Sequence, residues 1–370
     1  MYLKDLVDIQ MGQSPDSKFY NYDEIGLPFY QGKADFGRIN PRPKIWCSKP
    51  KKEAKPNDIL ISVRAPVGDL NINNEQSCIG RGLAAITCRS DVDMMYLYYY
   101  LKYLKPQLKH ISTGSTFESI NRTQLENLII DYKPYSEQIK ISNILQVVER
   151  EIEVKENLLR LYDLLIKSRF VEMFKTNKAY ISIGTLFQII DGDRGKNYPK
   201  STDFFEHEYC LFLNAKNVTK NGFCFDTVQF ITQQKDEQLK KGRVLPEDII
   251  LTTRGTVGNV AYCDIECFYK HMRINSGMVI LRAKDIIYDV DFITYVLSNQ
   301  TNYGKAISGS AQPQLPISIL KDIMIPFPEM LLQKDFGYFI NKINKLKSDV
   351  QKSIDETQLL IDSLMQEYFG

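Results

Sequence analysis

The segment PNDILISVRAPVG, residues 56–68, recurs 190 positions later as PEDIILTTRGTVG, residues 246–258. Both copies hold the same Pro, Asp, Ile, Arg, Val and Gly at matching places. Each copy is typical of a short buried strand followed by an arginine and a turn. Because self-similarity at a long period marks a repeated structural unit, the segment predicts two similar domains in one chain.

Further blocks extend this repeat toward the C-terminus. IGRGLAAI at 79–86 matches INSGMVIL at 274–281, and ISTGS at 111–115 matches AISGS at 306–310. These blocks share an offset of 195 rather than 190, and surface loops tolerate insertions of this size. The repeat therefore covers a large part of each half.

Each half closes with a long proline-free segment whose apolar residues follow 4-3-4 spacing, over 138–174 and 333–369. The series are Ile141, Leu145, Val148, Ile152, Leu159, Tyr162 and Ile166, and Phe336, Ile340, Ile343, Val350, Ile354, Thr357, Ile361, Leu364 and Tyr368. Lys155 and Lys347 each interrupt one position. This period predicts a coiled-coil seam. Since neither helix buries its seam alone, we expect the two to pair antiparallel.

These patterns predict four segments: a globular domain at 1–135, a long helix at 136–175, a second domain at 176–330 and a second long helix at 331–370. Strand-like runs alternate with helical stretches inside each domain, for example 59–63 followed by 94–104. The predicted fold class is α+β, with two similar domains in a pseudo-two-fold arrangement separated by an antiparallel coiled coil.

Composition excludes several classes of protein. The 370 residues are 44% hydrophobic and 25% charged, with a formal net charge of +2, which is ordinary for a globular protein. No apolar run approaches the ~20 residues that a membrane span needs, and the N-terminus lacks a signal-peptide core. Seven irregularly spaced cysteines indicate free thiols rather than a disulfide framework. We therefore expect a cytoplasmic protein.

No catalytic or metal-binding constellation emerges. The phosphate-binding and dinucleotide-binding glycine motifs are absent, as is an Asn/Asp-Pro-Pro-aromatic run. The three histidines lie far apart, and Cys263 with Cys267 has no further pair at zinc spacing. The sequence therefore favours a binding protein over an enzyme, without a metal site.

Local charge points to nucleic acid. Residues 38–55 carry seven lysines and arginines against Glu53 alone, although a solvated lysine-rich loop gives the same pattern. Arg64 and Arg254 end the repeated strands, where a guanidinium either reaches DNA or ties down its loop. The candidate phosphate contacts are Arg38, Lys44, Arg64, Lys241 and Arg254.

The Gly-Ser loops are the candidate base readers. Their flanks agree between the halves while their central residues differ, as expected for two readers of different sequence on one scaffold; a turn feeding a buried strand is the alternative. Glutamine suits adenine and the shorter polar side chains suit several base edges. The candidates are Ser115, Thr116, Asn121, Ser310, Gln312 and Gln314.

Together the duplicated P-x-D-I blocks, the I-S-x-G-S segments and the two Gln-containing terminal helices resemble the specificity subunit of type I restriction–modification systems. The resemblance covers nearly the whole chain. Glu137-Gln138 matches the helix entry of that family, whereas the second helix keeps Gln333 without the preceding glutamate.

This resemblance implies a non-catalytic subunit with two target recognition domains, each reading one half of a bipartite double-stranded DNA site. The coiled coil then sets the spacing and docks two methyltransferase subunits, and restriction subunits join the complex. S-adenosylmethionine and ATP belong to those partners, and this chain needs no cofactor of its own. By the same resemblance, polar residues after the first strands face the bases: Gln31, Lys33, Asn214 and Lys216.

Other readings of the sequence remain open. A coiled-coil scaffold that binds proteins differs by failing to bind duplex DNA or heparin. A specificity subunit of a type IIB-like enzyme differs in its neighbouring genes. An enzyme with an unrecognised active site is the third alternative. The recognised bases and the spacer length do not follow from the sequence.

Overall fold

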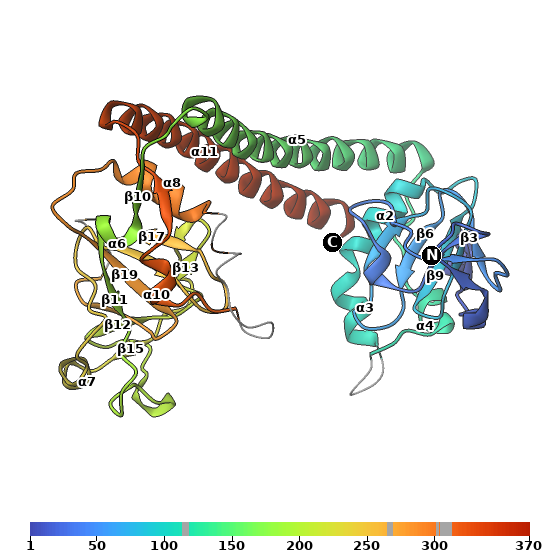
Figure 1. Ribbon diagram of the computed structural model, residues 1–370. Coiled ribbons are helices and arrows are strands. Elements are labelled where there is room, and N and C mark those ends of the chain that lie inside the picture. Colours follow the sequence, from blue (N-terminus) through green and yellow to red (C-terminus); the bar gives the residue numbers. More distant parts are fainter. Residues whose placement is uncertain (113–117, 265–268, 301–302, 304–312) are drawn as a thin grey trace. The chain divides into compact units, whose positions relative to one another are not determined.

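The computed structural model describes residues 1–112, 118–264, 269–300, 303 and 313–370. The chain forms two compact units. Unit 1 comprises Met1–Leu159 with Val350–Gly370, and unit 2 comprises Arg160–Asp349. Each unit therefore contains one α+β domain and a segment of both long helices (Figure 1). The sequence divides the chain into four consecutive segments, whereas unit 1 is made of two separate stretches of the chain. The four-segment division stays a prediction.

Unit 1 is built on two sheets. The first is antiparallel with strand order β1-β9-β6-β7, and the second has the order β2-β4-β3-β8-β5, in which β3 and β8 run parallel. The strands are β1 (Val7–Met11), β2 (Tyr20–Asn21), β3 (Leu27–Tyr30), β4 (Trp46–Cys47), β5 (Glu53–Ala54), β6 (Ile59–Ser62), β7 (Leu70–Ile72), β8 (Ser77–Ile79) and β9 (Leu83–Cys88). The helices are α1 (Leu3–Leu6), α2 (Met94–Tyr103), α3 (Lys105–Ile111) and α4 (Arg122–Glu126), with 3₁₀ turns at Ser17–Phe19 and Lys33–Asp35.

Unit 2 repeats the antiparallel sheet as β11-β19-β16-β17 and the parallel strand pair as β12 with β18. Its strands are β10 (Tyr180–Ser182), β11 (Phe187–Asp191), β12 (Cys210–Leu213), β13 (Val218–Thr219), β14 (Gly222–Phe223), β15 (Phe230–Ile231), β16 (Ile249–Thr252), β17 (Val260–Tyr262), β18 (Met272–Ile274), β19 (Met278–Ala283) and β20 (Met324–Pro326). Its helices are α6 (Ile183–Leu186), α7 (Gln233–Gln238), α8 (Val290–Ser298) and α10 (Ile317–Leu320), with a 3₁₀ turn at Ser201–Asp203.

The repeated sequence forms the centre of each antiparallel sheet. Strand β6 lies between β7 and β9 and is buried at every residue, because Ile59 and Ile61 pack into one apolar cluster and Leu60 into another. Strand β16, between β17 and β19, is covered on both faces in the same way. Such strands read as continuous apolar runs rather than as alternating ones. The α+β fold class predicted from the sequence is confirmed, and it rests on this duplicated sheet.

Two 40-residue helices complete the chain, α5 (Tyr135–Phe174) and α11 (Met330–Phe369). In unit 2 they run antiparallel, because Phe174 contacts Phe336 while Asp163 pairs with Lys347. In unit 1 the Lys155 ammonium donates to the Thr357 hydroxyl at 2.8 Å. Both lysines that interrupt the apolar seam therefore have polar partners on the opposite helix.

A buried glutamine connects each long helix to its domain. Gln138 Oε1 accepts a hydrogen bond from the Asp93 amide at 2.8 Å, and Gln138 Nε2 donates to the Lys133 carbonyl at 2.8 Å. Gln333 does the same in unit 2 with the Asp289 amide, at 3.1 Å, and the Pro328 carbonyl, at 2.8 Å. These bonds satisfy backbone groups at the start of both the long helix and the domain helix.

Candidate DNA interface

A cleft of about 250 Å³ opens in unit 1 at the ends of strands that come from both sheets. We name it the basic cleft, and it is lined by Ser14, Gln31, Gly32, Lys33, Arg64, Ala65, Arg81 and Gly82. These residues follow β1, β3, β6 and β8, so four separate loops meet there. The lining holds three cationic side chains and no acid, which makes the cleft a candidate anion site.

The strand pairing decides which residues reach the basic cleft. Strands β3 and β8 are parallel, and their last paired residues are Tyr30 and Ile79. The carboxyl ends of parallel strands meet at one edge, so Gln31 and Arg81 emerge side by side. The Val63 amide then donates to the Gly82 carbonyl at 2.9 Å, which places Arg64 beside the same loop.

One carboxylate, that of Asp69, partly neutralises the positive charge next to the basic cleft. Asp69 lies 2.9 Å from the Lys33 ammonium and 2.6 Å from the Lys105 ammonium. Partial burial opposes ionisation of Asp69, but the hydrogen bonds and charges of Lys105 and Lys33 outweigh it and lower the pKa of Asp69. Arg64 and Arg81 make no ion pair among the described residues, so they supply the uncompensated positive charge.

Unit 2 places equivalent residues around the same loops. Strand register equates Gln31 with Asn214 and Arg81 with Ser276, because Leu213 pairs with Ile274 as Tyr30 pairs with Ile79. Lys216 is the counterpart of Lys33, and Arg254 is the counterpart of Arg64.

The backbone around Arg254 also repeats that around Arg64. The Thr253 amide donates to the Gly277 carbonyl at 2.8 Å, and Arg254 forms a β-bridge with Gln314 as Arg64 does with Ser119. Arg254 is half-buried, and its Nε is buried without a hydrogen-bond partner in the described part of the chain. Such an unmet donor is unusual in a native protein.

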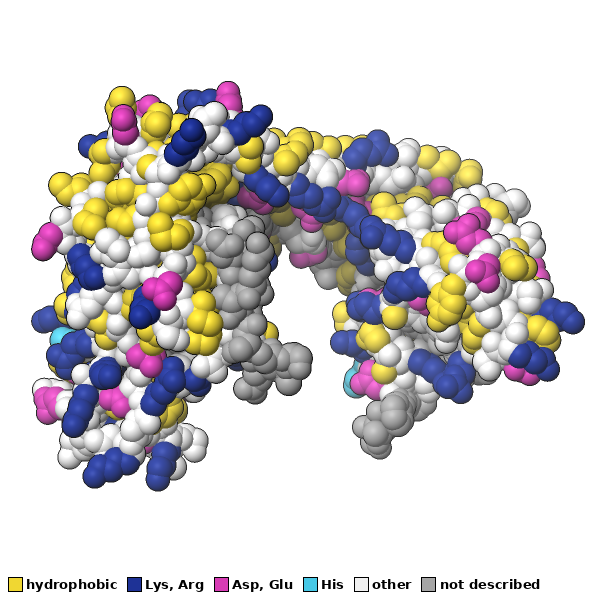
Figure 2. All heavy atoms as spheres, in the orientation of Figure 1, with side chains coloured by type: hydrophobic (Ala, Val, Ile, Leu, Met, Phe, Trp, Pro, Cys, Tyr) yellow, Lys and Arg dark blue, Asp and Glu magenta, His cyan; other side chains and the backbone are white. Residues whose placement is uncertain are grey.

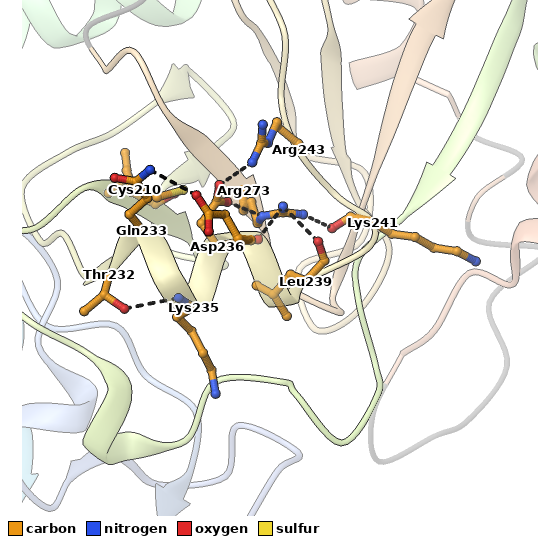
Figure 3. Close-up of polar contacts among 11 residues, drawn as sticks. Cys210, Thr232, Gln233, Lys235, Asp236, Leu239, Lys241, Arg243 and Arg273 are labelled. Atoms are coloured by element: carbon orange, nitrogen blue, oxygen red, sulfur yellow. Dashed lines mark hydrogen bonds and ion pairs between the residues drawn. The ribbon is translucent and has the colours of Figure 1, made fainter.

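A buried ion pair holds the loop that carries Lys241 (Figure 3). Arg273 on β18 pairs with Asp236 on α7, and both side chains are at most 4% exposed. The same guanidinium donates to the Lys241 carbonyl at 2.6 Å and to the Leu239 carbonyl at 3.0 Å. Lys241 therefore has a fixed backbone and an exposed side chain.

Other sequence-predicted site residues lie outside the basic cleft. Arg38 forms an ion pair with Glu156 on α5, which gives it an anchoring role. The Lys44 ammonium donates to the Ala34 carbonyl at 2.7 Å. Asn121 caps α4, accepting from the Gln124 amide at 2.9 Å. Four further candidates lie outside the described residues: Ser115, Thr116, Ser310 and Gln312.

The sequence prediction missed two arginines at this candidate site, Arg81 and Arg194. Arg81 lines the basic cleft, and Arg194 occupies the unit 2 position equivalent to Ser14. The repeat blocks already contained the signal, since Arg81 aligns with Ser276 inside an otherwise matching segment.

The cysteine prediction was wrong at one position. Cys263 is disulfide-bonded, whereas Cys47, Cys78, Cys88, Cys210 and Cys224 are free thiols. Irregular spacing argues against a framework of several bridges but does not exclude a single bridge. Within the described residues, no group of three His, Cys, Asp or Glu side chains is placed to hold a metal ion. No helix in that part of the chain has the length and hydropathy to cross a bilayer.

Comparison with known proteins identifies the family. The family model described as "Type I restriction modification DNA specificity domain" matches residues 1–160 and 176–357. The chain therefore belongs to this family. It is a specificity subunit, the non-catalytic DNA-recognition component of a type I restriction–modification complex.

Individual relatives agree with this assignment. A putative type I restriction enzyme MjaX specificity subunit from Methanocaldococcus jannaschii is 46% identical over 148 residues, which cover 40% of this chain and 35% of that protein. The MjaIX specificity subunit of the same organism is 25% identical over 98% of this chain and 90% of that protein.

A solved structure supports the fold over the full length. The type I restriction–modification S subunit from M. genitalium matches with a TM-score of 0.58 at 18% identity, over 100% of this chain and 95% of that one. At this identity the match shows a shared fold.

Proposed function

We propose that each unit binds one half of a split double-stranded DNA site, unit 1 through the basic cleft and unit 2 through the equivalent loops. The observation that carries this proposal is the duplicated loop arrangement. Lys33 and Arg64 of unit 1 recur as Lys216 and Arg254 of unit 2. Other side chains on the same loops differ between the two units. A fixed set of charges suits phosphates, which carry no sequence information, and varied polar groups suit base edges.

The paired long helices support the second part of the proposal, in which α5 and α11 set the spacing between half-sites. Each is a continuous helix of 40 residues, or about 60 Å at the standard rise. Their length, rather than a flexible linker, would then fix the number of base pairs between the half-sites.

The same helices are the proposed docking surface for two methyltransferase subunits. Leu165 and Phe339 line an apolar groove between α5 and α11 in unit 2. Figure 2 shows further exposed hydrophobic side chains along the long helices. Restriction subunits would join through the methyltransferase subunits, which would carry S-adenosylmethionine, while the restriction subunits would carry ATP. Because the substrate is chromosomal DNA, the proposed location is the cytoplasm.

Mapping methylated adenines in a genome that carries this system tests the bipartite model. We expect a motif of two short specified segments separated by a fixed number of unspecified base pairs. A methylated motif without a gap contradicts the model. Lengthening both α5 and α11 by one heptad should widen the gap and leave both specified segments unchanged.

Salt dependence tests the phosphate role of Arg64. Each phosphate contact contributes about 0.9 to the slope of log affinity against log salt, so Arg64→Ala should reduce that slope by about 0.9. Arg89→Ala is the matched control, because Arg89 donates to the Asp5 carbonyl in α1 and does not line the basic cleft. Equal slopes for the wild type and Arg64→Ala would remove Arg64 from the interface.

A further inference from the structure

An arginine and a serine lie on two neighbouring loops in each unit, but the loop that carries the arginine in one unit carries the serine in the other. Ser14 follows β1 and Arg81 follows β8 in unit 1; the equivalent residues in unit 2 are Arg194 and Ser276. The loops touch in both units, since the Arg81 amide lies 3.3 Å from the Ser14 hydroxyl and Arg194 Nη2 lies 3.4 Å from the Ser276 carbonyl. One guanidinium is thus present in each unit, but it comes from opposite loops.

The backbone at this place is the same in both units, so the exchange does not reflect a different loop path. A Cβ added to Gly12 would lie 2.2 Å from the Gly80 carbonyl oxygen, and a Cβ added to Gly192 would lie 2.1 Å from the Asn275 carbonyl oxygen. The two loops approach so closely that only glycine fits at the first of them. Ser14 and Arg194 therefore leave equivalent backbone positions, two residues after these glycines.

The two arginines have donors available for a ligand. The Arg81 side chain is exposed and makes no hydrogen bond or ion pair in the described part of the chain. Arg194 Nη2 pairs with Asp191 at 3.0 Å, which orients the guanidinium, and the Asp193 carboxylate accepts backbone bonds from Gly195 and Lys240 that brace this loop. Burial is the largest single influence on this carboxylate and opposes its ionisation, but the backbone hydrogen bonds together outweigh it and lower the pKa of Asp193.

We infer that Arg81 in unit 1 and Arg194 in unit 2 are specificity-determining residues, each reading a guanine in its own half-site. The planar guanidinium fork matches the O6 and N7 acceptors of guanine in the major groove. Lys33, Lys216 and the two repeated arginines hold phosphates, because they are the same in both units. This inference rests on the proposed function and deepens it, since it names a base that each unit reads.

The opposite origins of the two guanidinium groups carry a consequence for the recognised sequences. The same framework meets its half-site with the base-reading arginine on the β8–β9 loop in unit 1 and on the loop after β11 in unit 2. Relative to the phosphates that the shared lysine and arginine contact, the guanine therefore lies at a different position in the unit 1 half-site than in the unit 2 half-site. The two half-sites are expected to differ in sequence while each contains a required guanine.

Selection from a randomised duplex DNA library by the full chain tests the inference. The probe is double-stranded DNA with a fully randomised central segment, and the recovered duplexes are sequenced. Arg81→Ala should lower the preference for guanine at one position of one half-site by on the order of 10- to 100-fold, leaving the other half-site unchanged. Arg194→Ala should do the same in the other half-site only.

Lysine variants separate base reading from simple charge. Arg81→Lys keeps the positive charge but loses the two-donor fork, so it should lose guanine preference as Arg81→Ala does while retaining more overall affinity. Arg89→Ala, the charge-matched control, should select the wild-type motif. Circular dichroism of each variant confirms that the exposed substitution has left the fold intact.

The outcomes are distinguishable. Uniform weakening by Arg81→Ala at all sequences, with full recovery in Arg81→Lys, would make Arg81 a phosphate contact and overturn the inference alone. Selection of an unchanged motif by both alanine variants would overturn it as well. Failure of the wild-type chain to select any motif would instead contradict the proposed function, and the inference would fall with it.

Discussion

Replacing Gln138 by alanine should destabilise unit 1 far more than an ordinary glutamine substitution does. Gln138 is fully buried, and its side chain is the partner of the Asp93 amide and the Lys133 carbonyl, both at 2.8 Å. Both backbone groups belong to half-buried residues, and a polar group that is buried without a partner costs about 1–3 kcal/mol. Alanine returns only a few tenths of a kcal/mol through helix propensity. The expected loss in free energy of unfolding is therefore about 2–5 kcal/mol.

Urea unfolding followed by tryptophan fluorescence measures this loss. Trp46 is the single tryptophan and lies in β4 of unit 1, so its signal reports the unit that Gln138 connects. With a slope of about 2 kcal/mol per molar urea, the midpoint should fall by about 1–2.5 M.

Gln358→Ala is the matched control for this measurement. Gln358 is an exposed glutamine on α11 whose side chain donates a surface hydrogen bond to Asp362, so the midpoint of Gln358→Ala should stay within about 0.3 M of the wild type. A shift for Gln138→Ala no larger than that of Gln358→Ala would refute the view that the buried glutamine joins the long helix to its domain.

Asp236→Ala should lower the free energy of unfolding of unit 2 by about 3–5 kcal/mol, because it leaves the Arg273 guanidinium buried without its carboxylate. Thermal unfolding measures the loss, and the exposed Asp226→Ala variant should change little. The Asp69 ion pairs should stabilise unit 1 with a defined pH dependence. Since the folded pKa of Asp69 lies below its ordinary value of 3.8, the advantage of wild type over Asp69→Asn should be complete above that pH and vanish as the pH falls through the lowered folded pKa. A difference between the two proteins that is independent of pH would contradict the assignment.

The long helices show how far periodicity alone carries a prediction. The 4-3-4 spacing predicted two helices and their antiparallel pairing, and the structure contains both, because a repeating apolar seam has few other ways to leave water. The spacing did not reveal how Lys155 and Lys347 are accommodated. Their partners, Thr357 and Asp163, lie about 200 and 180 residues away, and such pairs are set only when the helices align.

The interface shows a similar division. The repeat placed Arg64 among the candidates and the family resemblance added Gln31 and Lys33, and the structure brings these three into one cleft. The local cluster of basic residues also suggested Arg38, which is paired with Glu156 on α5. A cluster of basic residues in sequence does not say which side chains face the solvent and which face a neighbouring carboxylate.

The sequence by itself determined that the chain contains two copies of one domain and two long helices, because repeats and apolar periods are local properties that need no knowledge of distant contacts. Only the tertiary structure decided which loops share a surface. The parallel pairing of β3 with β8 brings Gln31 beside Arg81, and that of β12 with β18 brings Asn214 beside Ser276. Residues 50 or more positions apart meet there because strand register, which the buried core fixes, carries each loop to the same edge of the sheet.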